Sequence, residues 1–464
     1  MRAGVAQLVE QRFRKARAEG SIPFAGFYLS IVYSRESIVK YRVAKFTAVL
    51  HNRNFFLLWI GQIISQLGDR LDQMALIALV YAKAPGSSLS MAKTLSFTII
   101  PVFLVGPIAG AYVDRWDRRR IMFISDFLRA GLVLCIAAFL IDKSLVWVYL
   151  FIFTMFSVGR FFVPAKLSII PELVDKEHLV MANSLVNTTG MIAAVLGFGI
   201  SGIVVEKLGA QGGFYLDAVS FLVSGACIFS IAKKSLRDMK LKTAGKELVE
   251  AIRQSAIIRS SLLTDIKEGF HYFFQKKDLR ATAGIIFSLW SALGAVYVVI
   301  IVFVQKTLGS ATQDLGLLIM FLGIGLFCGS LAYGHVGHRF SQYKIIFISL
   351  ILSGIMVVAF ALGITQYPNF AVAACLSLLL GTAISPIMIA SNTIVHKVSE
   401  NHMLGKTFSS LEIIIHLGFL IFMFVSSIVA EHIHPLYILV TVGCAVAILG
   451  TVQLVRNHTI SWLD

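Results

Sequence analysis

Long apolar runs alternate with short polar turns from Asn54 to the end of the chain. A helix needs about 20 apolar residues to cross a bilayer, because each residue adds 1.5 Å through about 30 Å of hydrocarbon. Barrel strands are shorter and alternate strictly between apolar and polar residues, so the runs predict an all-α membrane protein. The twelve predicted spans are 55–82, 91–113, 120–141, 145–166, 184–206, 213–233, 281–305, 313–334, 343–365, 369–393, 406–429 and 435–455.

An internal repeat divides these spans into two sets of six. A shift of 224 residues aligns residues 120–125, which read Arg-Ile-Met-Phe-Ile-Ser, with residues 344–349, which read Lys-Ile-Ile-Phe-Ile-Ser. The same shift aligns Gly110 with Gly334. Two related six-helix halves are typical of a transporter whose site lies between them near the bilayer midplane.

The repeat and the polar stretches predict five segments. Residues 1–53 form an N-terminal extension that resembles the translation of a transfer-RNA gene, so we expect it to be disordered or to follow from a misassigned start. The other segments are an N-terminal bundle at 54–233, a cytoplasmic linker with an amphipathic helix at 234–280, a C-terminal bundle at 281–456 and a short cytoplasmic tail at 457–464.

Composition and charge fix the class of protein. A hydrophobic content of 57%, a charged content of 14% and a mean hydropathy of +0.81 exclude a soluble domain. With the N-terminus inside, 35 of the 41 Lys and Arg residues fall on the inner side, five fall outside, and Arg70 alone lies within a span. This asymmetry predicts a multi-pass protein of the cell inner membrane with both termini in the cytoplasm. The net charge of +16 is then a topology signal that favours contact with anionic lipid and not nucleic-acid binding.

No pattern of an enzyme is present in the sequence. A phosphate-binding Gly-x-x-x-x-Gly-Lys-Ser/Thr motif and metal-ligand spacings are lacking, so we expect no enzymatic activity, no cofactor and no metal. The five cysteines lie within apolar runs and are interpreted as small buried hydrophobic residues.

The turn between the second and third runs reads Gly110-x-x-x-Asp114-Arg115-x-x-Arg118-Arg119, and it resembles the loop signature of the major facilitator superfamily, with Asp117 in place of the usual glycine. Further segments resemble the macrolide-efflux-like branch, a group of drug:proton antiporters, over about residues 53–455. They are Asn54-Phe-x-x-Leu-Trp59, Gln66-Leu-Gly-Asp69, Pro164-Ala165, Pro171-x-Leu173-Val174, Ala182-Asn-Ser-Leu185 and Asp217-Ala-x-Ser-Phe221. The resemblance implies the major facilitator fold.

The glycine-proline signature of such exporters is incomplete. Residues 197–202 keep three glycines without the proline, and helix packing is the favoured role of these glycines.

The resemblance also implies a conformational latch on the cytoplasmic face. Charged loop residues there hold the two halves together when the cavity opens outward. The alternative is that they determine topology alone. The candidate latch residues are Gly110, Asp114, Arg115, Arg118, Arg119, His338 and Arg339.

Span one carries a polar stripe. Gln62, Gln66, Asp69 and Gln73 recur every three or four residues and therefore share one helical face, which we expect to line a wet cavity. Asp69, with Asp72 next in rank, is the first candidate for proton coupling, tuned by Arg70 or another cation. The alternative is a structural Asp-Arg pair that fixes this helix against a neighbour.

Span eleven offers a second candidate for coupling. Glu412 and His416 are four residues apart on one helical face, and histidine titrates near physiological pH. For Glu412 we favour an interfacial ion pair with loop arginines. By family analogy spans one, four, seven and ten surround the cavity, and bundle packing is the alternative for each lining residue. These further lining candidates are Arg160, Ser288, Trp290, Tyr297, Thr382, Ser385 and Asn392.

The sequence thus predicts a monomeric secondary efflux transporter. It is expected to export amphipathic drug-like or macrolide-like small molecules by proton antiport and alternating access, with protons as coupling ion and membrane lipids as neighbours. One alternative is a lysolipid flippase or siderophore exporter on the same fold. Another is a non-transporting membrane scaffold or sensor.

Overall fold

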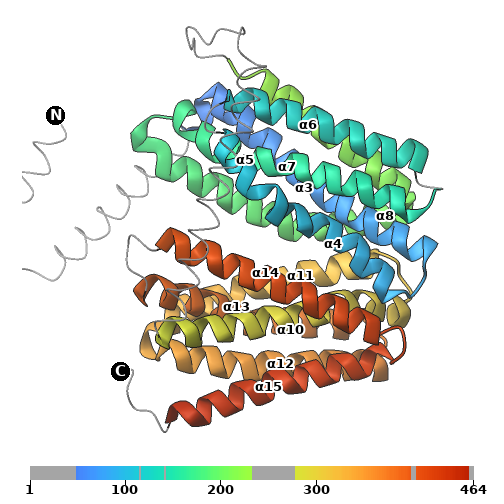
Figure 1. Ribbon diagram of the computed structural model, residues 1–464, viewed down its shortest axis with the longest axis vertical. Helices are drawn as coiled ribbons and strands as arrows, with labels where there is room; N and C mark the ends of the chain where they lie inside the picture. The colour runs from blue at the N-terminus through green and yellow to red at the C-terminus, as the bar shows by residue number, and fades with distance from the viewer. Residues whose placement is uncertain (1–48, 114–115, 141–142, 233–276, 399–403, 459–464) are drawn as a thin grey trace, which may run out of the picture. The chain divides into compact units, whose positions relative to one another are not determined.

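The computed structural model describes residues 49–113, 116–140, 143–232, 277–398 and 404–458, and its regular structure there is entirely helical (Figure 1). The helices are α3 Arg53–Lys83, α4 Ser88–Leu104, α5 Gly106–Val113, α6 Arg118–Cys135, η1 Ile136–Leu140, α7 Leu145–Leu173, η2 Lys176–His178, α8 Leu179–Phe229, α10 Lys277–Leu308, α11 Gln313–Val336, η4 Gly337–Arg339, α12 Gln342–Gln366, α13 Phe370–Val398, α14 Leu404–Val429 and α15 Pro435–His458. Most of the predicted extension, linker and tail lies outside the described residues.

The membrane class of the chain is confirmed. Among the described residues, nine helices are long and apolar enough to cross a membrane, and α4 is a shorter apolar helix. One of the nine covers two predicted spans, because α8 continues through Gly209, whose positive φ of 72° turns the chain between them. The count of twelve spans stays a prediction.

The chain divides into two compact units. The first holds residues 1–56 and 170–185, and the second holds residues 57–169 and 186–464. In the first unit, the Asn52 side chain accepts hydrogen bonds from the backbone N–H groups of Asn54 and Phe55 and so begins α3. Its amide nitrogen donates to the Leu173 carbonyl at 2.6 Å.

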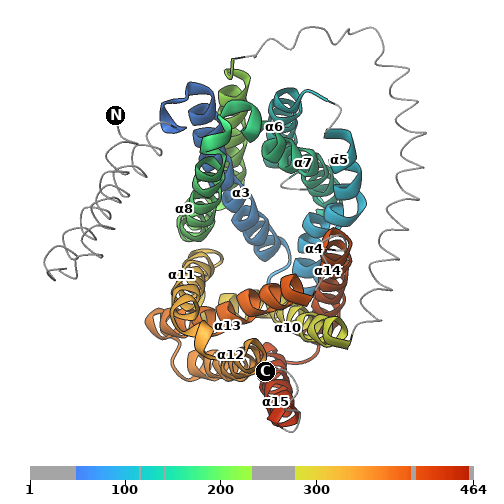
Figure 2. The ribbon, with the colours of Figure 1, turned by 90° about the vertical axis from the view of Figure 1, so that its left-hand side faces the viewer.

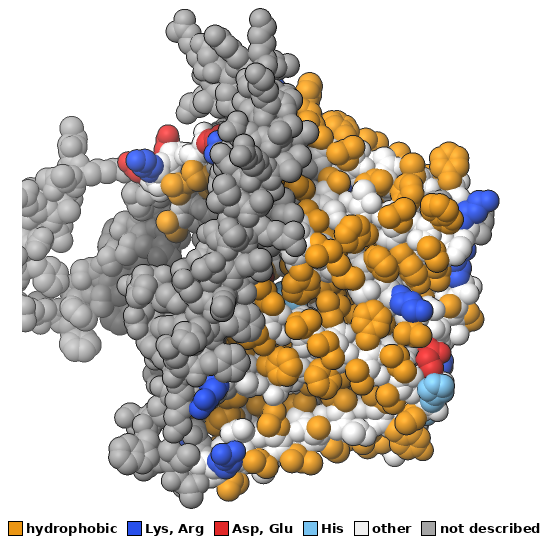
Figure 3. Space-filling model, in the orientation of Figure 1, with side chains coloured by type: hydrophobic (Ala, Val, Ile, Leu, Met, Phe, Trp, Pro, Cys, Tyr) orange, Lys and Arg blue, Asp and Glu red, His pale blue; other side chains and the backbone are white. Residues whose placement is uncertain are grey.

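Within the second unit, the C-terminal helices pack in pairs. α11 lies against α13, α12 against α13 and α15, and α10 against α14 and α15, while α4 contacts α14 and α10 (Figures 1 and 2). Figure 3 shows a face of predominantly hydrophobic side chains, with Lys, Arg, acidic and His side chains toward its right-hand edge and further Lys, Arg and acidic side chains on its left-hand side. Trp147, Phe327 and Leu331 are more than half exposed. Such a surface suits hydrocarbon as its solvent.

Glycines let several helices approach at backbone distance. A Cβ atom at Gly354 of α12 would lie 2.4 Å from the Gly443 carbonyl of α15. Between α8 and α11, a Cβ at Gly202 would lie 2.7 Å from the Thr312 carbonyl and 2.9 Å from the Gly316 Cα. Helices that meet in lipid use small residues in this way. The predicted packing role of the glycines in 197–202 is therefore confirmed at Gly202.

Candidate functional site

α3 and the second part of α8 run side by side at the centre of the candidate site. A Cβ at Gly68 would lie 1.8 Å from the Ser220 Oγ and 2.5 Å from the Asp217 Oδ1. One end of this contact is Gly213, whose Cβ would lie 2.9 Å from the Ala75 Cβ. Asp72 lies one helical turn from Gly68 on the same face of α3. The pairing of the two helices therefore brings Asp72 and Asp217 to one level.

A buried arginine joins α3, α6 and α8. Arg129 of α6 is 7% exposed, and its Nη1 lies 3.6 Å from the Asp69 Oδ1. Its Nη2 donates to the Asp126 Oδ1 one turn earlier on α6. The other Asp126 oxygen accepts a hydrogen bond of 2.7 Å from the Ser224 hydroxyl of α8. The guanidinium also lies over the rings of Phe162 and Phe221, with its carbon 5.0 and 4.1 Å from their centroids.

The distribution of charge along the sequence groups Arg129 with the cytoplasmic residues and leaves Arg70 as the lone cation within a span, and the structure shows that this prediction is wrong for Arg129. Arg129 lies eleven residues after the start of α6, about 16 Å along the helix, and is buried. A signal was available, because Asp126 and Arg129 are opposite charges at i and i+3 in an otherwise apolar run.

Two buried acids in the cluster have carboxylate oxygens without a hydrogen-bond partner among the described residues. Asp72 is 1% exposed and Asp217 is fully buried. Within the described part of the chain, both carboxylate oxygens of Asp72 and the Oδ2 of Asp217 are without a hydrogen-bond partner. The Ser220 hydroxyl is 3.2 Å from the Asp217 Oδ1. The charges of Asp69 and Arg129 act on both acids. The cluster thus holds more carboxyl groups than Arg129 alone can neutralise.

The polar stripe of span one contacts α8. Gln62 is buried with its amide nitrogen unpaired among the described residues, and the Gln66 Oε1 would lie 2.9 Å from a Cβ at Gly190. Arg70 donates to the Gln73 Oε1 at 2.9 Å, and its guanidinium carbon lies 4.8 Å from the Phe198 ring centroid. The ion-pair partner of Asp69 is therefore Arg129 of α6, while its neighbour Arg70 turns toward α8. Asp69 also acts electrostatically on Arg160 and Lys166 of α7.

The candidates of span eleven lie beside an aromatic group. The His416 ring meets Phe103 of α4 edge-on at 5.5 Å and stacks on Trp290 of α10 at 6.2 Å, measured between centroids. Its Nδ1 lies 2.7 Å from the Glu412 carbonyl. Phe419 contacts Trp290 and Tyr297, which completes the group. The structure thus brings the predicted residues Trp290, Tyr297 and His416 together, whereas the Glu412 side chain is exposed.

The remaining candidates for lining a cavity make contacts within their own helix or with one neighbouring helix. A Cβ at Gly329 of α11 would lie 2.5 Å from the Thr382 carbonyl and 2.9 Å from the Ser385 Cβ, so both residues belong to a helix–helix contact. The Ser288 hydroxyl donates to the Gly284 carbonyl of its own helix, and Asn392 is exposed. These contacts agree with the packing alternative for Thr382 and Ser385.

The predicted latch is described only in part, since Asp114 and Arg115 lie outside the described residues. Arg119 donates from Nε to the Ile228 carbonyl at 3.1 Å and from Nη2 to the Phe229 carbonyl, so it closes the C-terminal end of α8. Asp117, the residue that departs from the family signature, caps α6 by accepting from the Arg120 N–H. A Cβ at Gly110 would meet open space, and Arg339 is exposed.

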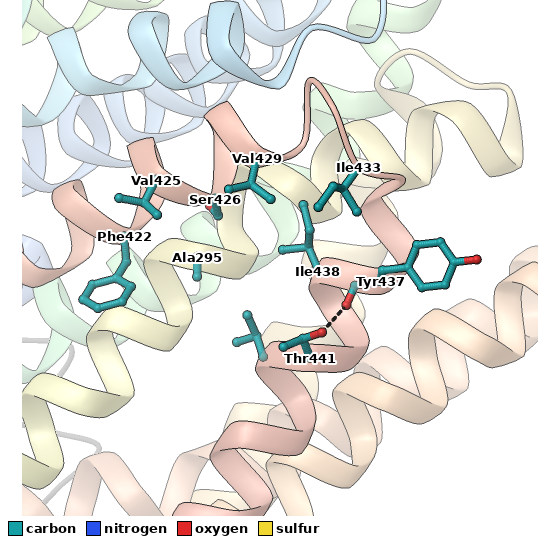
Figure 4. A pocket seen from close by; sticks show the side chains of 10 residues that line it. Ala295, Phe422, Val425, Ser426, Val429, Ile433, Tyr437, Ile438 and Thr441 are labelled. Carbon is teal, nitrogen blue, oxygen red and sulfur yellow. Dashed lines mark hydrogen bonds between the residues drawn. The ribbon is translucent and has the colours of Figure 1, made fainter.

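A separate apolar cavity of about 350 Å³ lies among α10, α14 and α15 (Figure 4). Ala295, Phe422, Val425 and Ile438 are among its lining residues, and Thr441 donates to the Tyr437 carbonyl at its rim. The residues predicted to line a cavity are not part of this lining. The cavity is therefore distinct from the charged cluster.

Comparison with known proteins identifies relatives along most of the chain. A family model described as transmembrane secretion effector matches residues 44–460. The MFS-type transporter YkuC of Bacillus subtilis is 26% identical over 77% of this chain and 81% of its own length. Macrolide efflux protein A of Streptococcus pyogenes is 28% identical over 49% of this chain and 53% of its own length.

Solved structures share the fold. The nucleoside transporter NupG superposes with a TM-score of 0.66 over 88% of this chain and all of its own, at 13% identity. At such identity the likeness shows the fold alone.

Proposed function

The chain belongs to the transmembrane secretion effector family of the major facilitator superfamily, which is a family of transporters and not of enzymes, and we propose that it is a secondary exporter of amphipathic small molecules driven by proton antiport. Twelve spans in two halves, alternating access, a monomeric state and an inner-membrane location with cytoplasmic termini belong to this proposal. Their support is the sequence repeat, the distribution of Lys and Arg, and the efflux function in the name of the macrolide relative.

One observation carries the proposal: three buried aspartates, Asp72, Asp126 and Asp217, and the partly exposed Asp69 gather around the buried Arg129. A charge at mid-bilayer costs about 2.5–3.5 kcal/mol even on the most lenient insertion scale, so such groups persist where they serve function. Asp69 and Asp126 share Arg129, while Asp72 and Asp217 lack hydrogen bonds to most of their oxygens within the described residues. A proton is the smallest ligand that neutralises such a carboxyl group without new contacts.

In this proposal Asp72 and Asp217 hold the coupling proton, and Arg129 responds to it. When a proton enters, the acids no longer compete for the guanidinium, which then favours Asp69 and Asp126. When the proton leaves, the negative charge near Asp69 favours a substrate with a cationic group. Proton and substrate then weaken each other's binding reciprocally, which is what antiport requires.

In this proposal the aromatic group around His416 supplies the apolar surface of the binding site. Phe103, Trp290 and Phe419 offer flat apolar faces that suit an amphipathic molecule, and His416 adds a polar edge. Asp69 stays the candidate that meets the substrate, because its side chain is 39% exposed while Arg129 is 9% exposed.

The test uses purified protein in proteoliposomes with an imposed proton gradient and a radiolabelled macrolide as probe. Asp72→Asn keeps the shape of the side chain and removes its charge, so we expect gradient-driven flux to fall at least about tenfold while gradient-free substrate exchange continues. Asp117→Asn is the matched control, since asparagine also caps a helix and the residue lies outside the cluster. Flux that is indifferent to the gradient in the unmodified protein would overturn the coupling.

A lysolipid flippase is the second candidate, and the apolar cavity among α10, α14 and α15 favours it. Phe422 and Tyr437 at this cavity are 41% and 65% exposed, so an acyl chain could enter from the surrounding lipid. Asp69→Asn separates the two functions. It should abolish proton-driven efflux of a drug-like probe and largely spare the movement of a fluorescent lysolipid.

A further inference from the structure

Glu206 of α8 closes the N-terminal end of a helix from the other half of the chain. Its Oε2 accepts from the backbone N–H groups of Thr312 at 2.7 Å and Gln313 at 3.1 Å, and from the Thr312 hydroxyl at 3.0 Å. Its Oε1 accepts from the N–H of Ala311 at 3.3 Å. These donors are the first groups of α11, which have no carbonyl partner within their own helix. The carboxylate therefore replaces the missing acceptors across the two halves.

Glu431, two residues after the end of α14, makes a similar contact in the opposite direction. Its Oε1 accepts from the Leu89 N–H at 2.9 Å and from the Ser87 hydroxyl at 2.9 Å. Leu89 lies in the first turn of α4, and Ser87 is the N-cap of that helix. A residue of the C-terminal helices thus closes the start of an N-terminal helix.

The two contacts are equivalent under the internal repeat. Glu206 and Glu431 are 225 positions apart, and so are Ser87 and Thr312, the residues that they contact. This offset is within one residue of the shift that relates the two halves in sequence. The arrangement is therefore a pair of matching contacts and not one isolated hydrogen bond.

Both contacts lie at the ends of spans predicted to face outward. With the termini in the cytoplasm, spans five and eleven run from inside to outside, so Glu206 and Glu431 stand at the outer surface. Helix N-termini carry a partial positive charge that favours a carboxylate. Because both glutamates are exposed, water can replace the contacts at modest cost, which suits a contact that breaks during a transport cycle.

We propose that Glu206 and Glu431 are two equivalent outer latches that hold the halves together on the external face and must both release before the exporter opens outward. They are separate from the loop residues predicted to act on the cytoplasmic face. The inference rests on the proposed function in one respect, namely that release of the latches corresponds to the outward-open state. The contacts themselves can be tested without substrate, because the experiment measures a distance between the helices.

The backbone beneath Glu206 shows how a latch can bring the halves close. One turn before it, Gly202 lies against Gly316 and Thr312, and its carbonyl accepts from the Thr312 hydroxyl at 3.0 Å. The α8–α11 contact therefore continues inward from the carboxylate. A substitution of Glu206 removes the carboxylate at the outer end of this contact and leaves the close approach of Gly202 and Gly316 unchanged. Such a variant therefore tests the latch and not the helix packing.

The experiment measures the distance across one latch while the other is changed. Spin labels at Lys93→Cys and His432→Cys, both exposed and near the Glu431 contact, are introduced in a background without the five native cysteines. Double electron–electron resonance in lipid nanodiscs then reports the distances. We expect Glu206→Gln to raise the fraction of the long-distance population about threefold or more, and Glu206→Ala to raise it further, because alanine removes the acceptor as well as the charge.

A double variant and a matched control sharpen the result. Glu206→Gln combined with Glu431→Gln should raise the ratio of long to short distances by about the product of the single effects, as independent contacts do. Asp314→Asn removes a carboxylate from the first turn of α11 without removing a contact across the halves recorded among the described residues, and it should leave the distances unchanged.

Two outcomes overturn the latches. One is an unchanged distribution in Glu206→Ala, and the other is equal opening in Asp314→Asn, which would assign the effect to surface charge in general. Neither outcome depends on flux, so failure of the latches and failure of the proposed export are distinguishable. The conservative Glu206→Gln keeps the experiment informative where the alanine variant does not fold.

Discussion

The two sets of helices resemble each other in sequence but differ in what they bury. Among the described residues, every buried charged side chain lies on α3, α6 or α8, namely Asp72, Asp126, Arg129 and Asp217. The buried polar side chains of α10–α15 are serine, threonine and glutamine, and glycine contacts join several of these helices. The buried charges that would suit ion coupling are therefore confined, among the described residues, to α3, α6 and α8.

The largest expected loss of stability comes from removing the arginine of the charged cluster. Arg129→Met removes the cation that pairs with Asp69 and Asp126 and roughly keeps the volume of the side chain, and we expect it to lower the free energy of unfolding by about 3 kcal/mol. Thermal unfolding in detergent measures this. Adding Asp126→Asn should recover part of the loss, because it removes one of the carboxyl groups left unpaired. A double variant no more stable than the single one would contradict a pairing of Arg129 with Asp126.

An added side-chain atom at a glycine contact between the C-terminal helices should lower the free energy of unfolding by a smaller amount. Gly354→Ala places a Cβ 2.4 Å from the Gly443 carbonyl, so α12 and α15 must move apart, at an expected cost of about 1–3 kcal/mol. The same unfolding measurement applies. Gly284→Ala is the matched control, since a Cβ there meets open space, and it should be neutral or slightly stabilising.

The smallest expected change in the free energy of unfolding comes from removing a buried polar group that carries no charge. The Ser353 hydroxyl of α12 is buried and has no partner among the described residues, so Ser353→Ala loses no recorded hydrogen bond. We expect a change within about 0.5 kcal/mol, or slight stabilisation, because an unpaired polar group already carries its desolvation cost. Asp72→Asn in the charged half should instead leave stability similar and change proton-driven flux.

The fold was largely predictable from the sequence because each span is specified by its own residues. Apolar length predicted the described helices, and the glycines of 197–202 predicted a close helix contact that Gly202 makes. These are local signals, or signals that compare one part of the chain with another. They do not require knowledge of which helices become neighbours.

The candidate site was only partly predictable for the opposite reason. Asp69 and Asp72 were identified from span one, but their partners Arg129 and Asp217 come from residues about 60 and 145 positions later. Assigning each basic residue to the nearest loop placed Arg129 in the cytoplasm. Its burial depends on α3, α6 and α8 converging on one point, and that convergence is a property of the packed bundle.

The turn at Gly209 has a mechanical consequence. Glu206 and Asp217 are eleven residues apart on α8, on either side of the one residue there with a positive φ. A Cβ at Gly209 would meet open space, so the positive φ, and not close packing, is what favours glycine at this turn. In the proposed transport cycle, a change of backbone torsion at this residue would move the external carboxylate of Glu206 relative to the buried Asp217, so the two ends of the helix need not move as one rigid rod.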